Sequence, residues 1–255
     1  MKSNDVVQSV DRALSILEAL SDGEMGLIDL SKKVELNKST VHRLLNTLIY
    51  KNYVSQNPEN NKYRLTFKVL ELGNKMLNTI SIVSIAKPYI TRLAEETNEV
   101  VHLVSIEGNE VVYIDKIDSN NTIRMHSYIG KSIPIYCTAV GKAYMASMDD
   151  EMFFETWKNI EKNIVKLTDN TITTKEAMLE ELKRIRDAGY SIDREENEED
   201  VVCVAAPIFN FDKKVKYAIS ISTPKIRIND EKIKLFGRLV KDTADKISKE
   251  LGYFK

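Results

Sequence analysis

One segment of the sequence, residues 38–50, combines an apolar stripe with four polar side chains at helical spacing. The apolar residues recur at the intervals of one helix face and are Val41, Leu44, Leu45, Leu48 and Ile49. The opposite face carries a hydroxyl, an imidazole, a guanidinium and an amide, from Ser39, His42, Arg43 and Asn46. Such groups hydrogen-bond base edges or phosphates, and a DNA major groove about 12 Å wide admits one helix. The pattern therefore predicts a helix that packs through one face and binds DNA through the other.

The charge around this segment also favours contact with phosphates. Between residues 31 and 68 there are eight basic and two acidic residues, a net charge of +6, whereas the whole chain carries −1. The basic residues are Lys32, Lys33, Lys38, Arg43, Lys51, Lys62, Arg64 and Lys68. A basic module within a nearly neutral chain is typical of a nucleic-acid-binding domain.

The neighbouring elements place this helix in a winged helix-turn-helix. Apolar periodicity predicts helices over residues 6–20 and 28–34, and Asn37 can cap the helix over residues 38–50. Two short strands, 54–56 and 62–65, follow across a turn-rich segment and form a basic wing. The predicted DNA-binding residues are Lys38, Ser39, Thr40, His42, Arg43, Asn46, Lys62, Tyr63 and Arg64. A solvated helix face with a charged hairpin, or a winged helix that binds protein, would show the same polarity.

Composition limits the class of protein. The 255 residues are 43% apolar and 29% charged, which favours one large or two ordinary globular domains over a disordered or membrane chain. The longest apolar run, Val201 to Phe209, is too short to cross a bilayer, and the N-terminus has no apolar leader. Cys137 and Cys203 are 66 positions apart and form no disulfide or zinc motif. We expect a cytoplasmic protein without a metal or cofactor.

The second half of the chain predicts an α+β domain on an antiparallel sheet. The expected strands are 100–106, 110–117, 123–128, 202–209 and 215–223, and the expected helices are 139–147, 151–160, 175–188 and 229–251. Residues 66–97 also look helical, with a break expected at Gly73 and Pro88 in the second part. The expected organisation is a winged helix-turn-helix over 1–66, a linker helix over 67–80 and a second domain over 81–255. No flexible Gly/Ser tether separates them.

Two patterns in the second domain suggest a pocket for a small acid. Residues 138–142 read as a turn that enters a helix, whose first N–H groups can bind a carboxylate, although Thr138 can also be a plain helix cap. Ser220 and Ser222 share one face of an otherwise apolar strand, with Ile219 and Ile221 on the other. Because buried hydroxyls must find partners, a bound polar ligand would supply them.

Other chemical groups have less specific interpretations. The segment 193–200 carries six carboxylates, which we interpret as a solvated loop apart from Asp193, since it lacks the spacing of a calcium loop. His102 and His126 are expected on the sheet surface, as core or interface histidines. The alternative to a regulator is an enzyme with Cys203 or Cys137 as nucleophile and one of these histidines as base, which requires a lowered thiol pKa.

Six collinear segments resemble the IclR-type bacterial transcriptional regulators. They are V-Q-S-V-D-R-A-L-S-I-L-E at 7–18, L-N-K-S-T-V-H-R-L-L-N-T-L at 36–48, Y-R-L at 63–65, P-I-Y-C-T-A-V-G-K-A at 134–143, G-Y-S-I-D-R-E-E at 189–196 and V-C-V-A-A-P-I at 202–208. The resemblance implies a dimeric or tetrameric repressor or activator, with an N-terminal winged helix and a C-terminal effector-binding domain. Asp200 departs from the family pattern, which often has Gly there, and this puts the conformation of loop 195–200 in question.

The resemblance also assigns residues to an effector site. The positions that match are Ala139, Val140, Asp193, Cys203, Ser220 and Ser222, with Met125 at the apolar wall. The chemistry of these groups favours a small organic acid with hydroxyl or keto groups. The segment around Tyr136 and Cys137 is similar to the branch that senses sugar acids such as 2-keto-3-deoxygluconate. A dimer would place two helices about one DNA turn apart, so the expected operator is near-palindromic.

Overall fold

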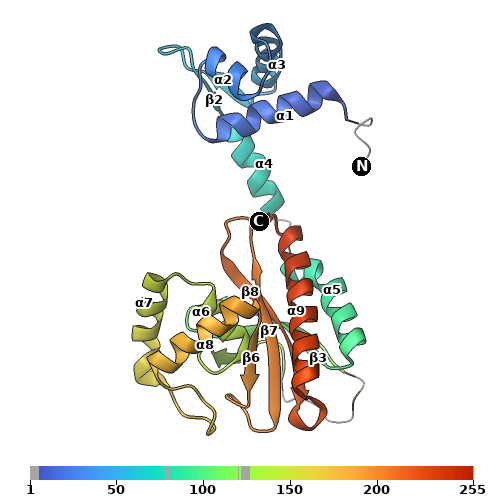
Figure 1. The fold of residues 1–255 in the computed structure, drawn as a ribbon. Helices are drawn as coiled ribbons and strands as arrows, with labels where there is room; N and C mark the ends of the chain where they lie inside the picture. Colours follow the sequence, from blue (N-terminus) through green and yellow to red (C-terminus); the bar gives the residue numbers. More distant parts are fainter. Residues whose placement is uncertain (1–5, 78–80, 120, 122–126, 255) are drawn as a thin grey trace. The chain divides into compact units, whose positions relative to one another are not determined.

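A computed structural model describes residues 6–77, 81–119, 121 and 127–254 (Figure 1). The chain divides into two compact units, Met1–Ile80 and Ser81–Lys255. Each unit has its own hydrophobic core, so each is described by itself.

The N-terminal unit is a winged helix-turn-helix. Its elements are α1 (Gln8–Ser21), α2 (Leu27–Lys33), α3 (Lys38–Tyr50), β1 (Val54–Gln56), β2 (Tyr63–Leu65) and α4 (Phe67–Leu77). The Asn37 side chain caps α3 by accepting the N–H of Thr40 at 3.0 Å, as the sequence predicted. Strands β1 and β2 pair in antiparallel register, and Ile16, Leu30, Val41 and Leu45 are fully buried between the three helices and the hairpin.

Helix α4 runs through Gly73, so the break predicted there is wrong. Nothing lies within 4 Å of the position that a Gly73 side chain would occupy. The glycine weakens a helix by about 1 kcal/mol relative to alanine, which is too little to end one without a capping turn. The helix over residues 67–77 is therefore continuous.

The C-terminal unit is an α+β domain with a six-stranded antiparallel sheet in the order β5-β4-β3-β8-β7-β6. The strands are β3 (Val100–Glu107), β4 (Glu110–Ile117), β5 (Ser132–Pro134), β6 (Ser191–Arg194), β7 (Val201–Phe209) and β8 (Val215–Pro224). The helices are α5 (Ile82–Thr97), α6 (Ala139–Ala146), α7 (Asp150–Ile160), α8 (Lys175–Ala188) and α9 (Asp230–Glu250), with short 3₁₀ turns at Glu161–Asn163 and Lys225–Arg227.

The helices cover the two faces of this sheet. Figure 1 shows α5 and α9 packed side by side on one face and α6, α7 and α8 on the other. The alternation of β8 divides its side chains as predicted: Ile219 and Ile221 enter the core beneath α5 and α9. Ser220 and Ser222 therefore point to the α6 face. No helix in the described residues combines the length and apolar character needed to span a bilayer.

Two strands of the sheet are not among the predicted ones. The strand expected at 123–128 falls largely on residues 122–126, which lie outside the described residues, and Tyr128 belongs to no strand. On the side of β4 away from β3, the sheet contains β5 at Ser132–Pro134, which the sequence pattern does not predict. Strand β6 was not predicted, because three of its four residues are polar and it adjoins an acidic loop. Its pairing with β7 is a long-range contact that the local pattern does not indicate.

Candidate functional site

The polar face of α3 is open to solvent. Ser39, His42, Arg43 and Asn46 are exposed, while Val41, Leu45 and Leu48 are buried on the opposite face. Lys38 is also exposed and Thr40 is half-buried in the first turn. The helix thus presents a hydroxyl, an imidazole, a guanidinium and an amide together, and none of these four side chains is used to hold the unit's core.

Of the three predicted DNA contacts on the β1–β2 hairpin, only the two cations reach the surface. Lys62 and Arg64 are exposed, and Lys62 Nζ lies 3.8 Å from Glu24. Tyr63, predicted as a DNA contact, is 5% exposed and packs in the core with Val54. Because side chains alternate along a strand, the residue between two outward cations must point inward. We therefore remove Tyr63 from the proposed DNA contacts.

In the C-terminal unit, four strands bring the predicted polar residues onto one face of the sheet. Register pairs Asp193 of β6 with Cys203 of β7, and Cys203 with Ser222 of β8. In the next row, Ser220 pairs with His102 of β3. Side chains that are directly opposite in an antiparallel sheet lie about 5 Å apart at Cβ. The sheet therefore gathers residues that are more than 100 positions apart in sequence into one cluster.

Hydrogen bonds connect most of this cluster. The Cys203 thiol donates to Ser222 Oγ at 3.2 Å, and Ser222 Oγ lies 3.2 Å from His102 Nδ1. His102 Nε2 lies 2.8 Å from Ser127 Oγ. Ser220 is 4% exposed, and no hydrogen bond joins its hydroxyl to another described residue. This hydroxyl can therefore hydrogen-bond a ligand or a water.

Asp193 is the acidic group of the cluster. It is 3% exposed, and its Oδ1 accepts the N–H of Glu196 at 2.7 Å. Burial raises the pKa of Asp193 to about 7. The carboxyl group therefore keeps its proton to higher pH than an exposed Asp, and in the protonated form it can donate as well as accept a hydrogen bond.

The start of α6 supplies two free N–H donors. Thr138 caps the helix, which is one of the two roles the sequence allows for it. Its Oγ1 accepts the N–H of Gly141 at 3.2 Å. The N–H groups of Ala139 and Val140 have no acceptor in the described part of the chain. Gly141 is required here, because a Cβ would lie 2.1 Å from the carbonyl oxygen of Ile135. The first turn of α6 thus packs directly against the backbone of Ile135. The N-terminal end of the helix carries the partial positive charge of the helix dipole.

The cluster includes residues that sequence reasoning missed. The Tyr113 ring lies 4.6 Å from the His102 ring, and burial raises the pKa of Tyr113, with further contributions from Cys203 and Asp193. Cys137 donates to Asn197 Oδ1 at 3.6 Å. A bulge between Leu103 and Val104 sets the register that brings Tyr113 to this face. The sequence of β4 alone contains no signal of that bulge. Met125, predicted at the apolar wall, lies outside the described residues.

The acidic segment 193–200 differs from the predicted solvated loop. Glu196 is 5% exposed and ion-pairs with Lys142, and Glu195 pairs with Lys225 at 2.6 Å. Asp200 has φ +61°, a left-handed conformation in which glycine is the least strained residue and Asp is tolerated. Asp200 therefore adopts a conformation that a glycine at this position would also adopt without strain.

The thiols do not have the properties of nucleophiles. Burial raises the pKa of both Cys137 and Cys203, and the Cys203 hydrogen bond goes to a serine and not to a histidine. Burial also lowers the pKa of His102 to about 3, so its imidazole is neutral. His102, interpreted from the sequence as a core or interface histidine, is buried in the domain. A cysteine enzyme would need a lowered thiol pKa and a base within reach.

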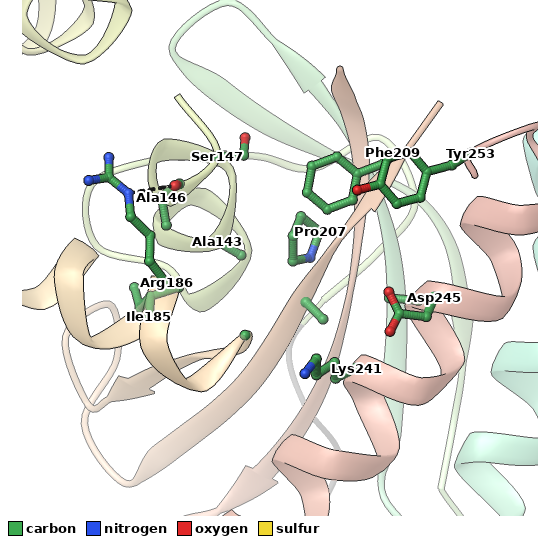
Figure 2. A pocket seen from close by; sticks show the side chains of 13 residues that line it. Ala143, Ala146, Ser147, Ile185, Arg186, Pro207, Phe209, Lys241, Asp245 and Tyr253 are labelled. Atoms are coloured by element: carbon green, nitrogen blue, oxygen red, sulfur yellow. Dashed lines mark hydrogen bonds between the residues drawn. The ribbon is translucent and has the colours of Figure 1, made fainter. Parts of the chain in front are cut away.

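Three cavities lined by described residues lie elsewhere, and no predicted effector residue lines them. Figure 2 shows one of about 350 Å³ at the edge of β7, where the Phe209 and Tyr253 rings stack near Pro207. Arg186 donates there to the carbonyl of Ala146 at the end of α6. A second, of about 780 Å³, lies between α8 and the start of α9, and a third lies in the N-terminal unit.

The two units together define a class: a winged helix-turn-helix with an exposed polar α3, joined in sequence to an α+β domain with a buried polar cluster. Residues 9–58 match the family described as the IclR helix-turn-helix domain, and residues 74–249 match the bacterial transcriptional regulator IclR C-terminal domain. The chain belongs to the IclR family of bacterial transcriptional regulators. It is a DNA-binding regulator with a C-terminal effector-binding domain, and not an enzyme.

Individual relatives agree with this family membership. The chain is 39% identical over 249 residues to the DNA-binding transcriptional repressor YiaJ of Escherichia coli K12, covering 96% of this chain and 88% of YiaJ. It is 37% identical over 253 residues to the regulator KdgR of the same organism, covering 99% and 95%. Among solved structures, the Thermotoga maritima IclR matches with a TM-score of 0.64 at 31% identity, covering 96% and 99%. The Agobacterium tumefaciens repressor BlcR matches with a TM-score of 0.74 at 27% identity, covering 98% and 100%.

Proposed function

We propose that this regulator binds a near-palindromic operator as a dimer or tetramer and changes its DNA affinity when a small organic acid binds the polar cluster. The observation that carries the proposal is the joint presence of an exposed basic α3 with its wing and a buried, incompletely satisfied polar cluster in the other unit. Such a protein works in the cytoplasm, where the DNA and the metabolite meet.

The DNA contacts follow from exposure and charge. Arg43, His42, Asn46 and Ser39 reach base edges, and the first turn of α3 and the wing bind phosphates. The phosphate-binding group consists of Lys38, Thr40, Lys62 and Arg64. Phosphate contacts position the protein, while base contacts select the sequence.

The effector chemistry follows from the donors of the cluster. A carboxylate rests on the N–H groups of Ala139 and Val140 at the positive end of α6. Ser220, Ser222 and a protonated Asp193 hydrogen-bond the hydroxyl or keto groups of the same ligand, while Cys203 provides a softer contact. We propose a sugar acid of the 2-keto-3-deoxygluconate type, because such a molecule carries one carboxylate beside several hydroxyls. Met125 is proposed as an apolar contact from the resemblance alone.

Exposed apolar side chains support self-association of the N-terminal unit. Helices α1 and α4 present Val10, Leu14, Phe67, Leu70 and Leu72, which are between 42% and 85% exposed. Clustered exposed apolar side chains of this size mark interaction surfaces. A second copy across a two-fold axis would cover them and place two α3 helices on successive turns of the same DNA face.

The test is a binding titration on DNA selected from random sequence with the wild-type protein. Fluorescence anisotropy measures its affinity for the selected duplex with and without 2-keto-3-deoxygluconate, at several salt concentrations. We expect a near-palindromic selected site, steep weakening with salt, and a change in affinity of at least fivefold on adding the acid. Asp193→Ala should bind DNA equally well without the acid and respond less to it. Binding that is insensitive to salt would indicate a winged helix that recognises protein, and no effect of any sugar acid would reject the ligand class.

A further inference from the structure

Lys142 is a fully buried lysine that the DNA contacts and effector contacts proposed above do not use. It lies on α6, three residues after Ala139, with 0% exposure. Its Nζ donates to the carbonyl of Ile192 at 2.6 Å, to Glu181 Oε1 at 3.2 Å and to Glu196 Oε1. All three N–H donors of the ammonium therefore have acceptors, one each from β6, from α8 and from the loop after β6.

These acceptors lie on the segments that shape the polar cluster. Ile192 is the residue before Asp193 in β6, and Glu196 donates its own N–H to Asp193 Oδ1 at 2.7 Å. The same strand is tied to the start of α6 by Ser191, whose hydroxyl donates to the carbonyl of Ala139 at 2.6 Å. One ammonium group thus joins the helix that presents the two free N–H groups to the loop that orients the Asp193 carboxyl.

The loop also contains a polar atom that its neighbours do not satisfy. Glu196 is 5% exposed, and its Oε2 is buried without a hydrogen-bond partner among the described residues. The Thr171 hydroxyl holds the backbone carbonyl of Glu196 at 2.7 Å. The side chain of Glu196 is therefore retained in the interior mainly through Lys142. Without the ammonium, a buried carboxylate would be left uncompensated, and the loop could satisfy it only by turning toward water.

We propose that Lys142 is a positioning residue of the effector site: it holds the end of β6 and the loop 195–200 onto α6 so that the Asp193 carboxyl and the first N–H groups of α6 face one ligand. The assignment of that ligand rests on the proposed function, whereas the attachment of the loop does not. Lys142 also lowers the pKa of Asp193 against the burial that raises it, which places its charge close to that carboxyl. Gly141 contributes by allowing α6 to approach the backbone of Ile135. Gly141 therefore determines where α6 packs, and the adjacent Lys142 binds the helix to β6 and to the loop after it.

The experiment compares the full-length wild type with K142M, E196Q and the double variant K142M/E196Q. The single variant K142M leaves Glu196 buried without its partner and can fail to fold, whereas the double variant removes both charges and keeps similar volumes. The matched control is K87M, which removes a lysine from the Lys87–Asp115 ion pair on the other side of the sheet. Amide hydrogen exchange by mass spectrometry is followed for peptides covering residues 193–200, without ligand. Affinity for 2-keto-3-deoxygluconate is then measured by calorimetry.

We expect the double variant to fold and bind the selected operator as the wild type does. Its 193–197 amides should exchange at least tenfold faster, with β7 and β8 unchanged, and its sugar-acid affinity should fall at least tenfold. K87M should match the wild type in both measurements. Wild-type exchange in the folded double variant would overturn the proposal, as would faster exchange with undiminished sugar-acid affinity. A wild type that binds no sugar acid, together with faster loop exchange in the double variant, would reject the ligand class and support the role of Lys142 in holding the loop.

Discussion

Replacing Asp193 by Asn should make the C-terminal unit more stable at high pH and leave its stability unchanged at low pH. The carboxyl group is 3% exposed, and burial raises its pKa from the ordinary 3.8 to about 7. Asn keeps the acceptor oxygen for the Glu196 N–H and cannot ionise. The variant therefore isolates the cost of placing a charge at this position.

The sign and magnitude follow from linkage. A carboxyl group whose folded pKa is raised binds its proton more tightly in the folded state, so stability is lost as pH rises from 3.8 through about 7. At about 1.4 kcal/mol for each pKa unit, the full difference is about 4 kcal/mol above pH 8. Local opening of loop 195–200 toward water would reduce this value. We expect Asp193→Asn to gain between about 1 and 4 kcal/mol at pH 8 and nearly nothing at pH 4.

The assay uses the only tryptophan of the sequence as a local reporter. Trp157 lies on α7, is 3% exposed and packs in the same core as Ala139 and Val140. Urea unfolding followed by Trp157 fluorescence therefore reports on the C-terminal unit, at fixed protomer concentration and at pH values from 4 to 8.5. Comparison of the two proteins at each pH cancels the other titrating groups. A free-energy difference that stays constant with pH, or an Asn variant that is less stable at pH 8, would refute the reasoning.

Three further predictions concern the wing, the glycines and the buried histidine. Removing both wing cations, Lys62→Ala with Arg64→Ala, takes four phosphate contacts from a dimer on its operator. The slope of log affinity against log salt, measured by anisotropy, should become less steep by about 3 to 4; an unchanged slope would remove the wing from the interface. Gly141→Ala should destabilise the C-terminal unit by about 3 kcal/mol or more, the upper end for overpacking, because the added Cβ would overlap Ile135. Gly73→Ala has open space around the added Cβ and should raise the stability of the N-terminal unit by about 0.5–1 kcal/mol. Urea titrations measure both changes. Equal effects of the two would contradict the packing of α6. His102→Gln should lose less stability than wild type as pH falls from 6.5 toward 4, because burial holds the folded His102 pKa at about 3; parallel pH profiles would contradict that burial.

Sequence reasoning was accurate where the physical signal is local. The bounds of α3, β1, β4 and α8 agree with prediction at both ends. In α3, apolar spacing and the Asn37 cap together fix both the helix and the face that remains exposed. The alternation of Ser220 and Ser222 against Ile219 and Ile221 was also readable, because the side-chain period of a strand is two residues.

It failed where the signal depends on distant partners. The acidic residues after Asp193 resemble a solvated loop, and only the buried ammonium of Lys142, 54 positions earlier, explains why Glu196 is inside. Tyr113 joins the polar cluster through a bulge in β4, where Ile114 is skipped in the pairing with β3, and the local sequence pattern does not indicate that bulge. The strand over 62–65 is predicted, but the assignment of Tyr63 to the DNA contacts ignores the alternation of faces along that strand. The prediction of a helix break at Gly73 fails because no capping pattern surrounds this glycine.

The central claim, that the polar face of α3 reads DNA, is tested most directly by the affinity of Arg43→Ala for the selected operator. Arg238→Ala, which changes another exposed arginine, on α9 of the other unit, is the matched control. Anisotropy titrations should show that Arg43→Ala loses about tenfold or more in affinity for the selected duplex while binding random DNA nearly as the wild type does, at about 1–3 kcal/mol for one base contact. Arg238→Ala should bind both duplexes normally. Full-affinity, sequence-specific binding by Arg43→Ala would contradict the claim.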